Sequence, residues 1–218
     1  MTHFSFDIVG FDLDGTLLDT SPDLTAAVNH ALSLLGRAPL SVAAVLPMIG
    51  RGARHMLERA LAASGGSNAG DLEWLYPELL RFYEAHIACG TTVYPGMLNA
   101  LDDLATRGAT LAIVTNKLEA LAIKLITELG LSAHFVTIIG GDTMPESKPS
   151  PVPIREMIAR CGGGRAAFVG DSSADILAAR AAGISSIAVD FGHGAADLGA
   201  DAVIDSYTDL IPTLERLA

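Results

Sequence analysis

The 218-residue sequence is poor in cysteine, in aromatic residues and in basic residues. Its two cysteines, Cys89 and Cys161, are too few for a disulfide framework and form no metal-ligand pattern with a histidine. We therefore expect two free, partly buried thiols in a reducing compartment. Lys and Arg number 14 against 25 Asp and Glu, which gives a formal net charge of −11. This charge disfavours nucleic acid and anionic membrane surfaces as partners, because no run of basic residues offsets it.

Long apolar runs are also missing. No window approaches the roughly 20 apolar residues that a membrane-spanning helix needs. Asp7 and Asp12 interrupt the first apolar stretch, which makes it a poor signal peptide. The cytoplasm is therefore the predicted compartment. Half of the residues are hydrophobic, however, and this proportion predicts a globular protein with a sizeable core.

Short apolar strands alternate with helical patterns along most of the chain. We expect a first strand over residues 6–13 and, after Pro95 and Gly96, further strands at TLAIVT, VTIIG, AAFVG, SSIAV and DAVID. Helical patterns lie between most of these strands. The alternation predicts the α/β class, with a doubly wound parallel sheet covered by helices on both faces.

The stretch from Asp23 to Gly90 has a different pattern. Its apolar residues recur at helical spacing, and two further helices are expected over residues 53–63 and 71–88. We therefore predict an inserted helical domain over residues 18–90. Residues 1–17 and 91–218 would together form the α/β core.

Ligands of open parallel sheets bind beyond the carboxyl ends of the strands, so the residues just after each strand are candidates for a site. Asp12 and Asp14 follow the first strand and would repel each other unless a cation lies between them, although Asp-Gly is also ordinary turn chemistry. Thr115 and Asn116 follow TLAIV and suit the binding of a phosphoryl oxygen, whereas Thr115 could equally cap a helix.

Two later segments add a lysine and two more carboxylates. Lys148 lies in a proline-rich segment that restricts its position, although most lysines are solvated at the surface. Asp171 and Asp175 follow the strand AAFV and lie one helical turn apart. Asp171 fits as a magnesium ligand and Asp175 as the acceptor for a metal-bound water, but both could simply stabilise a helix N-terminus.

These segments together resemble a known superfamily. DLDGT, the strand ending in Thr115, Lys148 in a KPSP context and GDSSAD are similar to the four motifs of the haloacid dehalogenase (HAD) superfamily. The likeness extends across essentially the whole chain, and the helical segment occupies the position of that superfamily's inserted cap. The resemblance implies a magnesium-dependent phosphomonoester hydrolase.

The resemblance also implies a role for each matching residue. Asp12 would attack phosphorus and become an aspartyl phosphate, and Asp14 would protonate the leaving group and then deprotonate water. Magnesium would bind Asp12, the main-chain carbonyl of Asp14 and Asp171, with Asp175 supporting it. The implied contacts to the phosphoryl group come from Gly15, Thr16, Thr115, the backbone N–H of Asn116 and Lys148.

Within the superfamily, the segments FDLDGTLLDTSPDL, IGRGARHMLERAL and SKPSPVPI are most similar to bacterial phosphoglycolate phosphatases, which implies 2-phosphoglycolate as the substrate. Arg51, or Arg54 as the second candidate, could then bind the substrate carboxylate, unless both are solvated. A β-phosphoglucomutase, a pyrophosphatase or a sugar-phosphate phosphatase would use the same core. The alternative from a different class is a catalytically silent phosphate-binding module. The sequence does not indicate an oligomeric state.

Overall fold

The computed structural model describes residues 4–193 and 199–218. Within these residues, parallel strands form one six-stranded sheet in the order β5-β4-β1-β6-β7-β8. The predicted α/β fold with a doubly wound parallel sheet is confirmed. The strands are β1 (Ile8–Phe11), β4 (Thr110–Val114), β5 (Thr137–Ile139), β6 (Ala166–Gly170), β7 (Ser185–Val189) and β8 (Ala202–Ile204).

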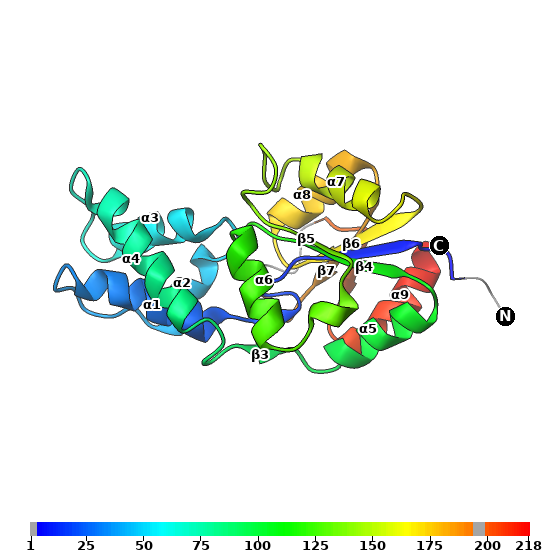
Figure 1. The fold of residues 1–218 in the computed structure, drawn as a ribbon, viewed down its shortest axis with the longest axis horizontal. Helices are drawn as coiled ribbons and strands as arrows, with labels where there is room; N and C mark the ends of the chain where they lie inside the picture. The colour runs from blue at the N-terminus through cyan, green and yellow to red at the C-terminus, as the bar shows by residue number, and fades with distance from the viewer. Residues whose placement is uncertain (1–3, 194–198) are drawn as a thin grey trace.

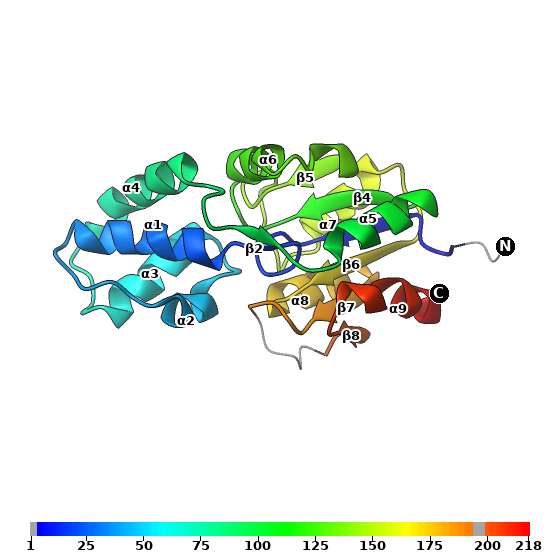
Figure 2. The ribbon, with the colours of Figure 1, turned by 90° about the horizontal axis from the view of Figure 1, so that it is seen from below.

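Helices cover both faces of this sheet (Figures 1 and 2). Alternate residues of a strand point to opposite faces, and on β1 Ile8 and Val9 accordingly belong to two different apolar clusters. Ile8 packs with α7 (Val152–Arg160) and α8 (Ser173–Ala182). Val9 packs in the cluster that includes α5 (Met97–Thr106), α6 (Glu119–Glu128) and α9 (Leu210–Leu217). Two short 3₁₀ helices, η2 (Ser132–His134) and η3 (Tyr207–Asp209), lie in connections.

Residues 21–85 form a helical unit at one end of the molecule, at the left of Figure 1. Its helices are α1 (Ser21–Ser33), α2 (Val42–Val45), α3 (Ala53–Ala63) and α4 (Asp71–Ala85), with the 3₁₀ helix η1 (Leu46–Met48) after α2. The sequence pattern did not indicate α2 and η1, since so short a segment has no apolar periodicity to read. Helix α4 ends three residues before the predicted 88.

Two short strands join the helical unit to the sheet. β2 (Leu18–Asp19) and β3 (Thr92–Val93) pair in antiparallel fashion. Beside them, the buried Asp23 carboxylate accepts hydrogen bonds from the backbone N–H groups of Gly90 and Thr91, both at 2.8 Å, and from the Thr91 hydroxyl at 2.7 Å. The two connections are therefore tied together where the unit begins and ends. The division into a core and a cap with a boundary at 18–90 stays a prediction.

The register of the sheet brings the predicted site residues together. β1 lies between β4 and β6, and Phe11 pairs with Ile113 on one side and with Val169 on the other. The residues that follow these three strands therefore meet at one edge of the sheet, and Asp12 N–H donates to the Val169 carbonyl at 2.9 Å.

Two further observations concern expectations from composition. In residues 4–193 and 199–218, no helix combines the length and the apolar character needed to cross a membrane. Both cysteines are free, and Cys161 is half-buried as expected. The same expectation is wrong for Cys89, which is exposed because it lies in the bend after α4.

Candidate active site

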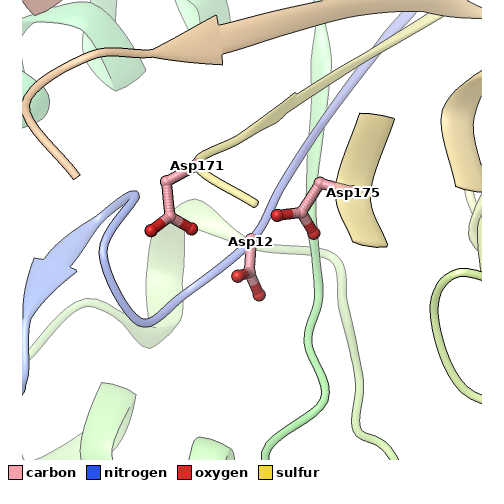
Figure 3. Close-up of side chains that lie close together, drawn as sticks. All are labelled: Asp12, Asp171 and Asp175. Carbon is pink, nitrogen blue, oxygen red and sulfur yellow. The ribbon is translucent and has the colours of Figure 1, made fainter. Parts of the chain in front are cut away.

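Three buried carboxylates converge at the carboxyl ends of the central strands. Asp12 follows β1, Asp171 follows β6 and Asp175 lies in the first turn of α8, and Figure 3 shows the three side chains close together. Their exposed fractions are 3%, 2% and 0%. One oxygen from each lies within 4.8 Å of the others. Like charges at such distances repel strongly in a buried site, so the arrangement requires nearby positive charge.

Lys148 supplies part of that charge. Its ammonium lies 2.9 Å from Asp12 Oδ1 and donates to Asp175 Oδ1 and to the Val114 carbonyl, each at 2.6 Å. The side chain is 1% exposed, so Lys148 is not the solvated surface lysine of the alternative interpretation. Burial opposes its charge, but the two neighbouring carboxylates outweigh burial and raise the pKa of Lys148.

One ammonium does not balance three carboxylates. Burial, with the charge of Asp175 adding to it, raises the pKa of Asp12 from 3.8 to about 6 although Lys148 acts in the opposite direction. Burial and the charges of Asp175 and Asp12 likewise raise the pKa of Asp171 well above its usual value. A cluster of carboxylate oxygens that lacks positive charge fits a divalent cation.

Asp171 is held close to the backbone that follows Asp14. Its Oδ2 accepts a hydrogen bond from the backbone N–H of His193 at 2.8 Å, and its Oδ1 lies 3.4 Å from the hydroxyl of Thr16. Gly15 has a φ of +85°, and a Cβ there would lie 2.2 Å from Asp171 Oδ2. Only glycine permits this approach, so Gly15 and Thr16 together position the Asp171 carboxylate.

The structure supports the interpretation of Asp175 as a residue that stabilises a helix N-terminus, whereas its role as the acceptor for a metal-bound water stays a prediction. Its Oδ2 accepts from the backbone N–H of Ser172 at 2.9 Å and from the Ser172 hydroxyl at 2.5 Å, as in a capping box at the start of α8. Its Oδ1 meanwhile accepts from Lys148. Each oxygen therefore already has a protein donor, which suits a residue that orients Lys148 more than one that binds a cation directly.

Asp14 has a partner that the sequence analysis missed. Lys117 donates to both of its oxygens, at 2.8 Å and 2.9 Å, and Thr20 donates to Oδ1 at 2.7 Å. Burial would raise the pKa of Asp14, but Lys117 and the Thr20 hydroxyl outweigh it and hold the pKa below the usual value. Lys117 comes two residues after Thr115, and this position at a strand end was the available signal for it.

Thr115 and Asn116 lie where they were expected, after β4. Thr115 is buried, and its hydroxyl accepts from the backbone N–H of Lys117 at 3.3 Å. The Asn116 side-chain amide donates to the carbonyls of Gly50 and Lys148, at 3.0 Å and 3.1 Å. Asn116 thus connects the site to the loop that precedes α3.

A cavity opens between these residues and the helical unit. The sheet side contributes Asp12, Asp14, Thr115, Asn116, Lys117, Leu118 and Leu121, and the helical unit contributes Leu24, Ile49, Gly50, Gly52, Ala53, Met56, Leu79 and Tyr83. Of the described residues, Lys117 is the single cation in this lining. Arg51 is exposed and outside the lining, although Gly50 and Gly52 on either side of it are part of it. Arg54 is exposed and pairs with Glu73.

The fold and the site define an enzyme of the parallel α/β class, with its reactive carboxylates at the strand ends beneath a helical unit. Residues 9–189 match the sequence model of a family described as haloacid dehalogenase-like hydrolase. The chain belongs to this family, and it is a phosphatase. Phosphatases of the family generally use a divalent metal, in agreement with the acidic cluster.

Named relatives and solved structures agree with this assignment. Proteins named phosphoglycolate phosphatase are 40% identical in Agrobacterium fabrum and 41% identical in Chromobacterium violaceum. The matches cover 94% and 95% of this chain and 90% and 96% of those proteins. The crystal structure of a predicted phosphoglycolate phosphatase from Haemophilus somnus 129PT superimposes with a TM-score of 0.90 at 29% identity, covering 95% of this chain and 97% of that one.

Proposed function

We propose that this phosphatase hydrolyses 2-phosphoglycolate to glycolate and phosphate, with magnesium as its metal and an aspartyl phosphate on Asp12 as the intermediate. The observation that carries the proposal is the buried carboxylate cluster beside Lys148, which has too little positive charge for its three carboxylates. The relatives' names support the choice of substrate. The cavity beside Asp12 supports it too, because a small leaving group could lie there.

Asp12 is the proposed nucleophile. Its carboxylate is buried directly after β1, borders the cavity and forms an ion pair with Lys148 at 2.9 Å. The neighbouring Lys148 ammonium offsets the repulsion between this carboxylate and an incoming phosphoryl group. Attack by Asp12 forms the carboxylate oxygen–phosphorus bond as the bond between phosphorus and the leaving oxygen breaks.

Asp14 is the proposed proton carrier in both halves of the reaction. In the first half, its carboxyl group gives a proton to the leaving oxygen of the ester, so glycolate departs as an alcohol. In the second half, the Asp14 carboxylate takes a proton from water as that water attacks phosphorus. The bond between phosphorus and Asp12 then breaks, which releases phosphate and restores both side chains.

The remaining residues after the strands hold the phosphoryl oxygens. We assign this role to the Thr115 hydroxyl, the backbone N–H of Asn116 and the Lys148 ammonium, because phosphoryl transfer depends mainly on positioning and on stabilisation of negative charge. Gly15 and Thr16 adjoin them, and the missing side chain of Gly15 lets the backbone approach Asp171 closely.

Asp12, Asp171 and the main-chain carbonyl of Asp14 would hold the magnesium ion, with Asp175 as support. Bound there, the cation would supply charge neutralisation and orientation for the phosphoryl group. Oxygen ligands and only one or two carboxylates are typical of magnesium in proteins. Burial and the neighbouring carboxylates raise the pKa values of Asp12 and Asp171, which Lys148 lowers too little to compensate.

Arg51 is the proposed contact for the substrate carboxylate. It lies between two glycines that have positive φ and border the cavity, and its exposed guanidinium is available to turn inward when the helical unit approaches the sheet. Arg54 is the weaker candidate, because Glu73 and Glu58 already surround it. We further propose a cytoplasmic enzyme without nucleic-acid or membrane partners, consistent with the free cysteines and the net charge of −11.

Phosphate release from a panel of small phosphate esters, with and without magnesium, tests the proposal. The expected result is the highest kcat/KM for 2-phosphoglycolate and no turnover without metal. A preference for a hexose phosphate or for pyrophosphate would replace the proposed substrate. Transfer of phosphate between positions on a sugar without release would indicate a mutase. Phosphate binding without any turnover would indicate the silent module.

A further inference from the structure

The proposed mechanism assigns no role to Lys117, although Lys117 is 7% exposed and contacts Asp14 directly. Its backbone is fixed on both sides. The N–H donates to the Thr115 hydroxyl at 3.3 Å, and the carbonyl accepts from Gly141 N–H at 2.8 Å. The ammonium also lies 4.7 Å from the centre of the Tyr83 ring, on α4. Contacts from both the sheet and the helical unit therefore fix the position of Lys117.

The two oxygens of Asp14 are not equivalent. Oδ1 accepts from both Thr20 and Lys117, whereas Oδ2 accepts from Lys117 alone. A carboxyl group that exchanges a proton with substrate must be held in a fixed orientation, and these three contacts fix the orientation of Asp14. Asp14 and Asp12 line the same cavity, so Asp14 borders the space that the ester would occupy.

We propose that Lys117 is the positioning residue for Asp14: by donating to both carboxylate oxygens, with Thr20 also on Oδ1, it fixes the orientation in which Asp14 gives a proton to the leaving oxygen and later takes one from water. This inference rests on the role of Asp14 in the proposed function. Lys117 does not itself touch the reacting atoms. It acts through the orientation of Asp14, and its loss therefore affects proton transfer selectively.

Leaving-group dependence separates this role from a general structural one. An unactivated alkyl ester such as 2-phosphoglycolate needs its leaving oxygen protonated, whereas a nitrophenyl ester departs as a stable anion. In Lys117→Met, kcat/KM should fall about 10- to 100-fold for alkyl esters, a part of the roughly 100- to 10,000-fold that general acid–base catalysis contributes, and less than about threefold for p-nitrophenyl phosphate. A rapid burst of nitrophenol should also grow, because Asp14 is then slow to deprotonate the water of the second half-reaction.

The chain offers a matched control and a rescue. Lys124 is a second lysine seven residues along; it lies on the surface of α6 and pairs with Glu128, so Lys124→Met should change neither ester. Lys117→Arg should recover part of the alkyl-ester activity because it restores a donor for Oδ1.

A double-mutant cycle keeps the test valid if Lys117→Met alone folds poorly. Asp14→Asn with Lys117→Met removes both members of the buried pair, and thermal unfolding shows whether it is folded. If Lys117 acts through Asp14, adding Lys117→Met to Asp14→Asn causes no further loss with alkyl esters. If the losses of the two single variants multiply in the double variant, the proposal is overturned. Equal losses of kcat/KM for alkyl and nitrophenyl esters in Lys117→Met would also overturn it.

Two other outcomes are informative. A loss confined to esters with a carboxylate, expressed in KM and independent of the leaving group, would make Lys117 a substrate-binding residue and overturn the positioning role. If the wild type prefers another alkyl phosphate to 2-phosphoglycolate, the proposed substrate fails, yet the comparison between alkyl and nitrophenyl esters still tests Lys117. Failure of the two proposals is thus distinguishable.

Discussion

Replacing Asp12 by Asn should abolish turnover and at the same time stabilise the metal-free protein. The amide keeps nearly the same shape but removes the attacking anion. It also removes one of three crowded charges. The rise in the pKa of Asp12 from 3.8 to about 6 corresponds to about 3 kcal/mol against the ionised form, at about 1.4 kcal/mol for each pKa unit. This figure already includes the attraction of Lys148, and it is an upper limit on the gain.

The sign of the pH dependence follows from the same values. Above pH 6, Asp12 is ionised in the folded and the unfolded protein, and the folded state carries the full penalty. As pH falls from 6 toward 3.8, only the folded state is protonated to a large extent, and the penalty disappears. Asp12→Asn should therefore raise the Tm of the metal-free protein by up to roughly 6 to 12 °C at pH 7.5. The gain should shrink as pH falls through 6.

Thermal unfolding in chelator, with wild type and variant side by side, measures this effect. Asp102 offers a matched control, because its side chain is 70% exposed on α5 and Asp102→Asn should leave Tm nearly unchanged. Saturating magnesium should favour the wild type and reduce the difference. A metal-free Asp12→Asn protein that is less stable than the wild type at pH 7.5 would refute the reasoning about charge crowding.

Three other changes have defined outcomes. A chelator should abolish hydrolysis and magnesium should restore it, and calcium should substitute poorly because it accepts more ligands. The apparent affinity for the metal should weaken as pH falls through 6, because Asp12 then gains a proton. Activity in chelator with a site shown to be metal-free would contradict this. Arg51→Ala should lower kcat/KM for 2-phosphoglycolate by a factor equivalent to roughly 2 to 4 kcal/mol of lost transition-state stabilisation, and kcat/KM for p-nitrophenyl phosphate much less. Equal losses for the two esters would assign Arg51 to closure of the helical unit over the site. Asp175→Asn should lower the unfolding free energy by about 1 to 3 kcal/mol, since Lys148 loses a charged partner; unchanged Tm would show that this ion pair contributes nothing net.

The sequence predicted the parts of the site that depend on sheet topology. Parallel strands end at one edge, so any residue directly after β1, β4 or β6 lies at that edge whatever its rotamer. Asp12, Thr115 and Asp171 are such residues, and the structure brings all three there. The doubly wound sheet was predictable for the same reason, because alternating strands and helices admit few other arrangements.

The direction of individual side chains and the shortness of some strands account for what the sequence did not predict. Whether Lys117 points toward Asp14 depends on how the chain turns after β4, and spacing alone does not define that turn. The strands β2 and β3 are two residues each, too short for an alternating pattern. Asp175 does have a local signal, since Ser172 lies three residues before it and the pair forms a capping box, but its second contact with Lys148 comes from a distant segment.

Trapping the covalent intermediate tests the central claim most directly. The enzyme, magnesium and 2-phosphoglycolate labelled in its phosphoryl group would be mixed rapidly, quenched with acid and digested for peptide mapping. We predict label on the peptide that contains Asp12, released by hydroxylamine as expected for an acyl phosphate and absent from Asp12→Asn. Formation of glycolate without labelled protein during the first turnover, or label on any other residue, would contradict an aspartyl phosphate on Asp12.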